Sequence, residues 1–375
     1  MLQKGFTIGW LFSILFSFHV SAQTRLLSQA PQYRQVASQA VTAIYAWNFD
    51  SANKYINQLS AQLPEHPVTP FVKALNIYWQ EVPIDFESQA FQKHFSYLRK
   101  AEKQAESILE QDENNVEGIF FKMIAKAFIM RHYAEQNKSM KAVGEAKVVY
   151  RLIKQGFDLQ EQFSEFYFTS GLYNYYREAF PERYPLYKPF AVFFQKGDKT
   201  KGLKQLQYTS KHGVYTRCEA INYLVWIYLH YEHDSEMAQK YAYQATRFFP
   251  KNQLFKVQYI ETLTLTGEYQ KARQPIRELL HNSNDDFYKM AGYCFRGMEK
   301  EFNQQDLKAA KVDYELAEKL AEQLGTRSKD YKTYIYMGLY QYYKQNNNRE
   351  KQRLYLKLAK EHDHSDYVKR RRKRQ

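Results

Sequence analysis

The sequence predicts an all-α protein built from repeated helical hairpins, and three observations support this prediction. Strand signals are scarce, because few alternating apolar and polar runs are bounded by turn residues. Long segments instead keep an apolar period of about 3.6 residues, which is typical of amphipathic helices. One pattern also recurs after 34 residues. It occupies the slots Ala238, Ala242, Ala245 and Pro250 in its first copy, and Ala272, Ile276, Leu279 and Asn284 in its second.

This spacing, with Gly267 in the turn of the second copy, resembles that of the tetratricopeptide-repeat (TPR) family. The resemblance implies an α-solenoid of stacked antiparallel helix pairs, because one hairpin cannot bury its apolar face alone. It also implies that the first helix of each pair lines a concave face where a partner lies. The groove residues implied in this way are Tyr223, Ile227, His230 and Tyr231, followed by Val257, Glu261 and Thr264.

One departure from the TPR pattern concerns a slot that is usually small in the first helix of each pair. Trp226 and Ile260 occupy it here. Bulk at this slot implies looser contacts between helices, or compensation by alanines opposite. The individual repeats are therefore divergent, and the sequence leaves their number open.

The first 22 residues have the features of a signal peptide. Lys4 gives a basic start, an apolar stretch follows, and small residues precede a cleavage point near Ala22. The apolar run is too short for a membrane span, and no later stretch reaches that length without charges. We expect an exported protein, periplasmic or secreted and soluble after cleavage. Its junction before Gln23 is similar to those of exported Bacteroidetes-type proteins.

Helical repeats are predicted over residues 23–160 and again over residues 214–361. In the first region an amphipathic helix runs to about Trp47, and Asp50 is placed to cap the helix that follows. In the second region the 34-residue pattern is followed by two further helix pairs. One of these pairs keeps the same four-then-three spacing at Ala310, Tyr314 and Ala317.

Residues 161–213 are predicted to be a helical insert outside the repeat pattern. Between Phe163 and Phe194 there are 13 aromatic residues in 32 positions, and prolines recur at every fourth position from Pro181. Because proline disrupts helix interiors, we expect a helix through Tyr176 and then an irregular segment. Asp198 is placed to cap a further helix that Gly213 ends. The segment is either a hydrophobic plug or a platform for a glycan or peptide, formed by Tyr173, Tyr176, Tyr184 and Tyr187.

The last residues, 362–375, are predicted to be a disordered basic tail. Without its basic run and Lys4, the formal charge of +14 falls to +7. The tail is either a solubilising end or a contact for an anionic lipid or lipopolysaccharide surface. Nucleic-acid binding is not expected, since it would need a basic face interleaved with stacking aromatics. The basic run consists of Lys369, Arg370, Arg371, Arg372, Lys373 and Arg374.

No motif in the sequence predicts catalysis, a cofactor or a metal site. The glycines of residues 197–202 have Leu203 where a phosphate loop needs lysine. His230 and His233 share one helix face, but no third metal ligand can be named. Cys218 and Cys294 lie about two repeats apart, too far for a disulfide, and are expected to be buried free thiols.

Two functions remain open from the sequence. The first is a non-enzymatic exported scaffold that binds a protein or peptide partner in the cell envelope through the predicted groove. The alternative is a glycan- or peptide-binding module that uses the aromatic segment 163–194. Affinity for a defined partner would favour the first, and a change in tyrosine fluorescence on ligand addition would favour the second.

Overall fold

The structure is a computed structural model that describes Leu27, residues 30–363 and residues 366–373, without the side chains of Tyr187 and Phe190. The predicted signal peptide and Arg374 lie outside the described residues. Within them the chain is helical and contains no strand, which confirms the predicted all-α class. No helix of this described part is long and apolar enough to cross a bilayer.

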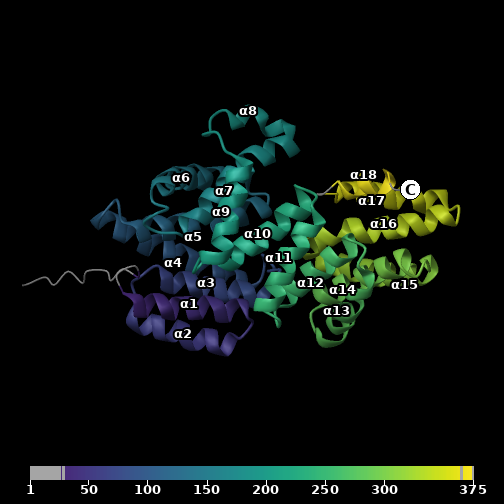
Figure 1. Ribbon diagram of the computed structural model, residues 1–375, viewed down its shortest axis with the longest axis horizontal. Coiled ribbons are helices and arrows are strands. Elements are labelled where there is room, and N and C mark those ends of the chain that lie inside the picture. Colours follow the sequence, from purple (N-terminus) through teal and green to yellow (C-terminus); the bar gives the residue numbers. More distant parts are fainter. Residues whose placement is uncertain (1–26, 28–29, 364–365, 374–375) are drawn as a thin grey trace, which may run out of the picture.

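Consecutive helices pack against each other in pairs, and the pairs stack into a superhelix (Figure 1). The helices are α1 (Pro31–Tyr45), α2 (Phe49–Gln62), α3 (Val68–Glu81), α4 (Gln89–Gln111), α5 (Val116–Glu135), α6 (Ser139–Asp158), α7 (Phe166–Arg183), α8 (Lys188–Ala191), α9 (Lys199–His212), α10 (Arg217–His230), α11 (Ser235–Phe248), α12 (Gln253–Leu265), α13 (Tyr269–Asn282), α14 (Asp286–Phe302), α15 (Leu307–Leu324), α16 (Lys329–Gln345), α17 (Arg349–Glu361) and α18 (Tyr367–Lys373), with short 3-10 turns η2 (Pro185–Tyr187) and η3 (Gly325–Ser328).

Side-chain caps explain where many of these helices begin. Asp198 accepts a hydrogen bond from the backbone of Lys201 and starts α9 as predicted, and Gly213 follows its end. Asp50 does not cap α2. The cap is Asn48, whose side chain accepts from the Ser51 backbone, while Asp50 lies inside the first turn. There its carboxylate complements the positive end of the helix dipole.

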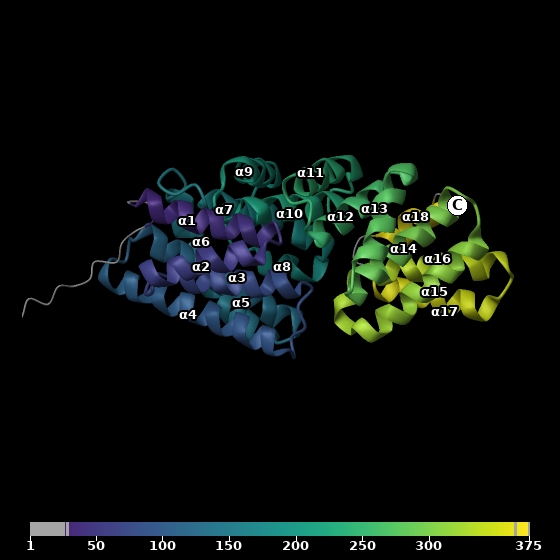
Figure 2. The same ribbon diagram turned by 90° about the horizontal axis from the view of Figure 1, so that it is seen from below.

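The two ends of the chain form separate groups of helices that α10–α13 join (Figure 2). Apolar side chains form two buried clusters, one running from Leu27 to Phe255 and the other from Val257 to Val368. The clusters meet at α12, which contributes to both. Trp47, in the turn after α1, packs against both clusters.

Contacts distant in sequence close the superhelix, because α1 and α3 lie against α10, α12 and α14. The hydroxyl of Tyr45 donates to Glu219 at 2.7 Å, and Asn252 donates to the backbone carbonyl of Tyr45 at 3.0 Å. The hydroxyl of Tyr288 donates to the carbonyl of Val82 at 3.0 Å. The inner faces of α10 and α12 are therefore partly covered by the first helices of the chain.

The aromatic region is a helix pair with a long connection. α7 packs against α9 as the flanking pairs do, and the residues between them project from the body. α7 continues past Tyr176 to Arg183 and contains Pro181. The proline is tolerated because it lies in the last turn, where only one helical hydrogen bond is lost. The domain boundaries drawn from the sequence stay predictions.

The end of the chain differs from the expected disordered tail, since residues 367–373 form α18. Tyr367 and Val368 are buried in the second cluster, and Arg371 forms a buried ion pair with Glu301. Burial of these three side chains offsets the entropy lost on ordering the segment. Cys218 and Cys294 are buried free thiols, as predicted.

Candidate functional site

An apolar cavity of about 890 Å³ lies between α5, α6, α7 and α10. Its wall is formed by aliphatic, methionine and aromatic side chains, among them Met123, Val149, Ile153, Leu172 and Tyr176. Cavities that bind ligands have volumes of about 300–1,000 Å³ and are mostly apolar with a few polar groups. This cavity is the candidate functional site.

Small residues create the cavity. Ala127 on α5 and Ala142 and Ala146 on α6 face it, where bulkier side chains would fill the space between the helices. Residues four apart lie on one helix face, so both α6 alanines point the same way. Val143 and Phe180 also line the cavity yet are 52% and 36% exposed, so the cavity opens to solvent between α6 and the end of α7.

A second cavity of about 680 Å³ adjoins the first. The two cavities share Arg131, Ala134, Glu135 and Tyr223 as lining residues. The second cavity is lined by polar and charged side chains as well as apolar ones. Together the cavities form a path that is apolar at the α6–α7 end and polar toward α12 and α16.

An arginine and a carboxylate stand at the junction of the two cavities. Arg131 Nε lies 3.7 Å from Glu135 Oε1, and the guanidinium lies 5.2 Å from the ring centres of Tyr78 and Phe128. Burial alone would lower the pKa of Arg131, but the neighbouring Tyr78 and Glu135 outweigh it and raise that pKa. Burial would raise the pKa of Glu135, but its neighbours, among them the Arg131 guanidinium, outweigh burial and lower that pKa. Both groups are charged at neutral pH.

Two buried histidines support α5 behind this junction. His94 Nδ1 donates to the carbonyl of Ala74 at 2.9 Å, and its Nε2 lies 2.8 Å from Nε2 of His132. The first bond makes Nε2 of His94 the acceptor, so His132 donates. Burial is the main cause that lowers the pKa of His94 to about 3 and also lowers that of His132. The pair is neutral and links α3, α4 and α5.

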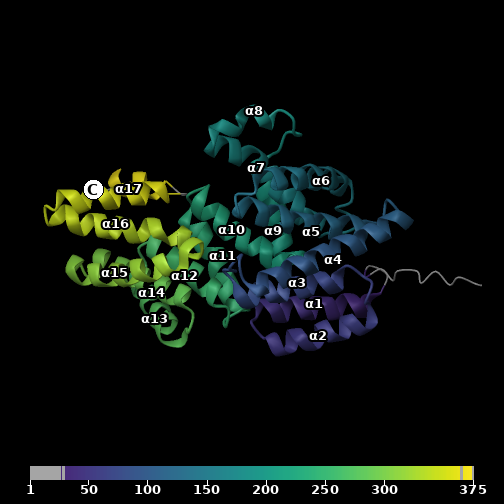
Figure 3. The same cartoon turned by 180° about the vertical axis from the view of Figure 1, so that it is seen from behind.

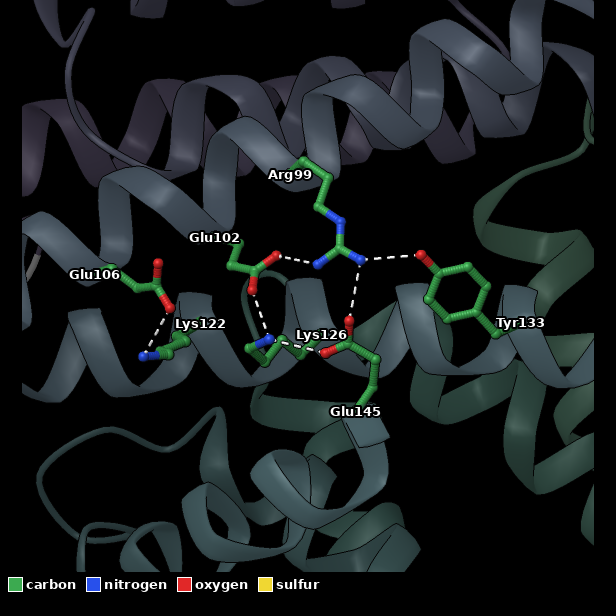
Figure 4. A network of polar contacts seen from close by, with 7 residues as sticks. All are labelled: Arg99, Glu102, Glu106, Lys122, Lys126, Tyr133 and Glu145. Carbon is green, nitrogen blue, oxygen red and sulfur yellow. Dashed lines mark hydrogen bonds and ion pairs between the residues drawn. The ribbon is translucent and has the colours of Figure 1, made fainter. Parts of the chain in front are cut away.

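An ion-pair network fixes α6 as a cavity wall (Figure 4). Lys126 on α5 reaches Glu102 on α4 at 2.5 Å and Glu145 on α6 at 2.8 Å. Arg99 on α4 binds the same two carboxylates at 2.7 and 3.0 Å, and also Tyr133 at 3.1 Å. Because three helices share these charges, α6 is held at the distance from α5 that leaves the cavity open. No local sequence pattern indicates this network, because its members are spread over 47 positions from Arg99 to Glu145.

The structure separates the predicted groove residues into two sets. Tyr223 and Tyr231 line the apolar cavity, while His230 and Glu261 line the second cavity. Tyr334 donates to Glu261 at 2.7 Å, and burial raises the pKa of that carboxyl to about 7. The other set is fully buried in the cores, where a partner has no access in this structure. It comprises Ile227, Val257 and Thr264.

The predicted aromatic platform is also divided. Tyr173 and Tyr176 line the apolar cavity, whereas Tyr184 lies outside it and is 36% exposed. The side chain of Tyr187 lies outside the described residues. The cavity residues of α5 and α6 were not predicted. A signal for them exists in the alanines at 142 and 146 with Val143 and Met140, which are small and apolar residues in the first half of α6.

In the part of the chain that the structure describes, no three His, Cys, Asp or Glu side chains come together at metal-binding spacing. His230 is buried, and His233 instead meets the last helix, with Nε2 4.0 Å from Asp366.

Of three comparisons with known proteins, the one with solved structures gives matches. No family model matches the chain, and no curated protein matches it. Among solved structures, a tetratricopeptide repeat protein from Parabacteroides merdae is similar over 77% of this chain and 93% of that one, with 13% identity and a TM-score of 0.30. The class of this protein, an α-solenoid of helix pairs, is thus defined by its own packing.

Proposed function

We propose that this protein is a non-enzymatic binding scaffold that holds an apolar segment of a partner protein in the cavity between α5, α6 and α7. The observation that supports this function is a preformed apolar cavity with an exposed apolar rim at Val143 and Phe180. Apolar rims of this kind mark binding surfaces, because exposed apolar area is costly unless a partner covers it.

The polar cavity beyond Arg131 and Glu135 favours a peptide over a wholly apolar small molecule. A peptide presents apolar side chains and a polar backbone together, and the path changes from apolar to polar along its length. The predicted signal peptide supports a partner in the cell envelope. The glycan alternative is weaker, since sugars need many hydrogen bonds and the first cavity offers few polar groups.

A cavity-filling substitution tests the proposal. Short apolar peptides selected for binding to the wild-type chain are titrated against Ala146→Phe, which puts a ring into the cavity from α6. The matched control is Gly144→Phe on the same helix, where an added Cβ meets nothing within 4 Å. We expect Ala146→Phe to weaken binding by about 100-fold and Gly144→Phe by less than about threefold.

Equal affinity of both variants for the selected peptides would contradict the proposal. Failure to select any peptide, together with specific binding on a glycan array, would support the aromatic segment as a carbohydrate site. Helix content measured by circular dichroism checks that each variant folds.

A further inference from the structure

The connection between α7 and α9 carries three strongly exposed apolar side chains. Leu186, Val192 and Phe193 are 81%, 76% and 78% exposed, and none of them lines the cavity. The connection stands out from the body beside α6 and α7 (Figures 1 and 3). We call residues 184–198 the α7–α9 loop.

The base of this loop is fixed to the helices below it. Tyr173 on α7 donates to the carbonyl of Gln195, and the backbone of Gln195 donates to Tyr150 on α6 at 2.8 Å. The backbone of Gly197 donates to Glu178 on α7 at 2.8 Å. A loop that is anchored at its base and apolar at its tip holds those side chains in water at a free-energy cost. Something is therefore expected to cover the tip.

The charged residues near the loop indicate which kind of surface covers its apolar side chains. Lys188 lies exposed within the loop, and Lys196 lies exposed at its base between Gln195 and Gly197. The helix α18 lies on the same side of the molecule as α8 (Figures 1 and 3), and it carries the exposed Lys369, Arg372 and Lys373. Apolar side chains next to lysines and arginines are the combination that binds an anionic lipid surface.

The turn between α10 and α11 connects the two basic regions. Arg183, at the end of α7, donates to the carbonyl of His230 at 2.6 Å. Arg370 of α18 bonds to His233 in the same turn. Arg371 is not available to a surface, because it is buried against Glu301, and Arg374 lies outside the described residues.

We propose that this edge is a membrane-docking surface, in which Leu186, Val192 and Phe193 enter an anionic bilayer while Lys188, Lys196 and the exposed basic residues of α18 bind its headgroups. This inference goes beyond the cavity function and does not depend on it. Docking places the cavity mouth, at Val143 and Phe180, close to the lipid surface.

Flotation with lipid vesicles tests the docking surface. The chain from Gln23 onward is mixed with phosphatidylcholine vesicles, with and without about one-third phosphatidylglycerol. We expect flotation only with the anionic vesicles, and about a tenfold loss when salt rises from about 0.1 M to about 0.5 M. Leu186→Ser/Val192→Ser/Phe193→Ser should reduce partition by at least about 30-fold.

The control is Val312→Ser/Leu316→Ser/Leu354→Ser, which removes three exposed apolar side chains from α15 and α17, away from the loop. It should float as the wild type does. Ala146→Phe should also float normally, so that failure of the cavity function and failure of the docking surface are separable.

A fluorescent probe reports insertion directly. Cys218 and Cys294 are buried, so a cysteine introduced by Phe193→Cys is labelled selectively in the native protein. We expect the emission of an environment-sensitive dye at this position to shift to shorter wavelength with anionic vesicles, and a dye at Leu354→Cys to stay unchanged.

Three results would overturn the proposal. The first is no flotation with either vesicle. The second is flotation that survives the triple loop variant but is lost with Lys369→Gln/Arg372→Gln/Lys373→Gln, which would show a purely electrostatic tether. The third is a dye shift that depends on protein concentration without vesicles, which would show that a second copy covers the loop.

Discussion

Two groups of three helices, α14–α16 and α5–α7, differ in whether the space between the helices is filled or open. In the first group the ring of Tyr314 on α15 lies between Gly297 on α14 and Gly338 on α16 and is fully buried. In the second group small residues again face the neighbouring helices, but Ala127 and Ala146 border an open cavity. No aromatic side chain fills the second space.

The filled space contributes to stability and the open space is available for binding, although both lie in the same repeat architecture. Filling the space stabilises the C-terminal helices, since close packing of a buried ring adds dispersion and removes apolar area from water. Leaving it empty loses that stabilisation in the N-terminal helices. The ion pairs of Lys126 and Arg99 keep α6 in place across the gap. The open space is then available to a partner.

The largest expected effect is a loss of stability in α14–α16, where the space between the helices is filled. In Gly338→Ala the new Cβ would lie 2.1 Å from Cε2 of Tyr314, whose ring has no room to move. We expect a loss of about 3 kcal/mol in the free energy of unfolding, measured by urea denaturation. Ala146→Phe adds far more volume but should cost less than about 1 kcal/mol, because the cavity accepts the ring. Equal losses would show that the α5–α7 space is not open.

The next effect tests Glu261, on α12 where the two cores meet. Burial raises its pKa to about 7 from a reference of 4.5. A raised carboxyl pKa stabilises the folded state at low pH, and that contribution is lost as pH rises through about 7. Glu261→Gln keeps the acceptor for Tyr334 and should be about 2–3 kcal/mol more stable than wild type at about pH 8, relative to about pH 5. A stability difference that does not vary with pH would contradict this assignment.

A somewhat smaller effect is the loss of stability in acid that His94, in the N-terminal helices, causes. The pKa of His94 is lowered from 6.5 to about 3, so the unfolded chain takes up a proton before the folded one does. Stability is full above about pH 6.5 and falls as pH drops toward 3. We expect His94 to account for a loss of about 2 kcal/mol between about pH 7 and pH 5, measured as the difference in pH dependence between the wild type and His94→Gln.

The Glu261 and His94 effects have opposite signs below pH 7 and partly cancel in the wild type. The pH series is therefore recorded for both single variants and for the double variant. An unchanged acid profile in His94→Gln would exclude the histidine pair as the acid-sensitive element.

The smallest expected effect is a gain in stability from a substitution on α6, beside the open cavity. Gly144 on α6 is exposed, and an added Cβ meets nothing within 4 Å. Gly144→Ala should therefore stabilise the protein by about 0.5–1 kcal/mol through helix propensity alone, seen as a higher melting temperature. A destabilised variant would mean that α6 packs more tightly than its exposure indicates. Together with Gly338→Ala, this substitution contrasts the two groups using one residue type.

The repeat architecture was predictable from sequence because its signals are local. Helical period, caps such as Asp198 and end residues such as Gly213 act within a few positions. The long-range closure was not predictable, since the bond of Tyr45 to Glu219 spans 174 positions and no repeat pattern encodes it. Ile227 and Val257 are buried in the two cores rather than lining a groove.

The site was only partly predictable for the same reason. The sequence predicts two separate sites, an aromatic platform and a groove. The superhelix brings two tyrosines of each site to one cavity: Tyr173 and Tyr176 from the platform, and Tyr223 and Tyr231 from the groove. Their role as binding residues stays a prediction. The order of α18 could not be foreseen in seven residues that are mostly basic, because it depends on Glu301, 70 positions away from Arg371.

Amide hydrogen exchange with a selected apolar peptide tests the central claim most directly. If the α5–α7 cavity is the binding site, the peptide should slow exchange in α6 over residues 142–153 and in α7 over residues 168–180, with little change in α14–α16. Protection in α14–α16 alone, or none in α6 and α7, would contradict the claim that the open space in the N-terminal helices is where this protein binds its partner.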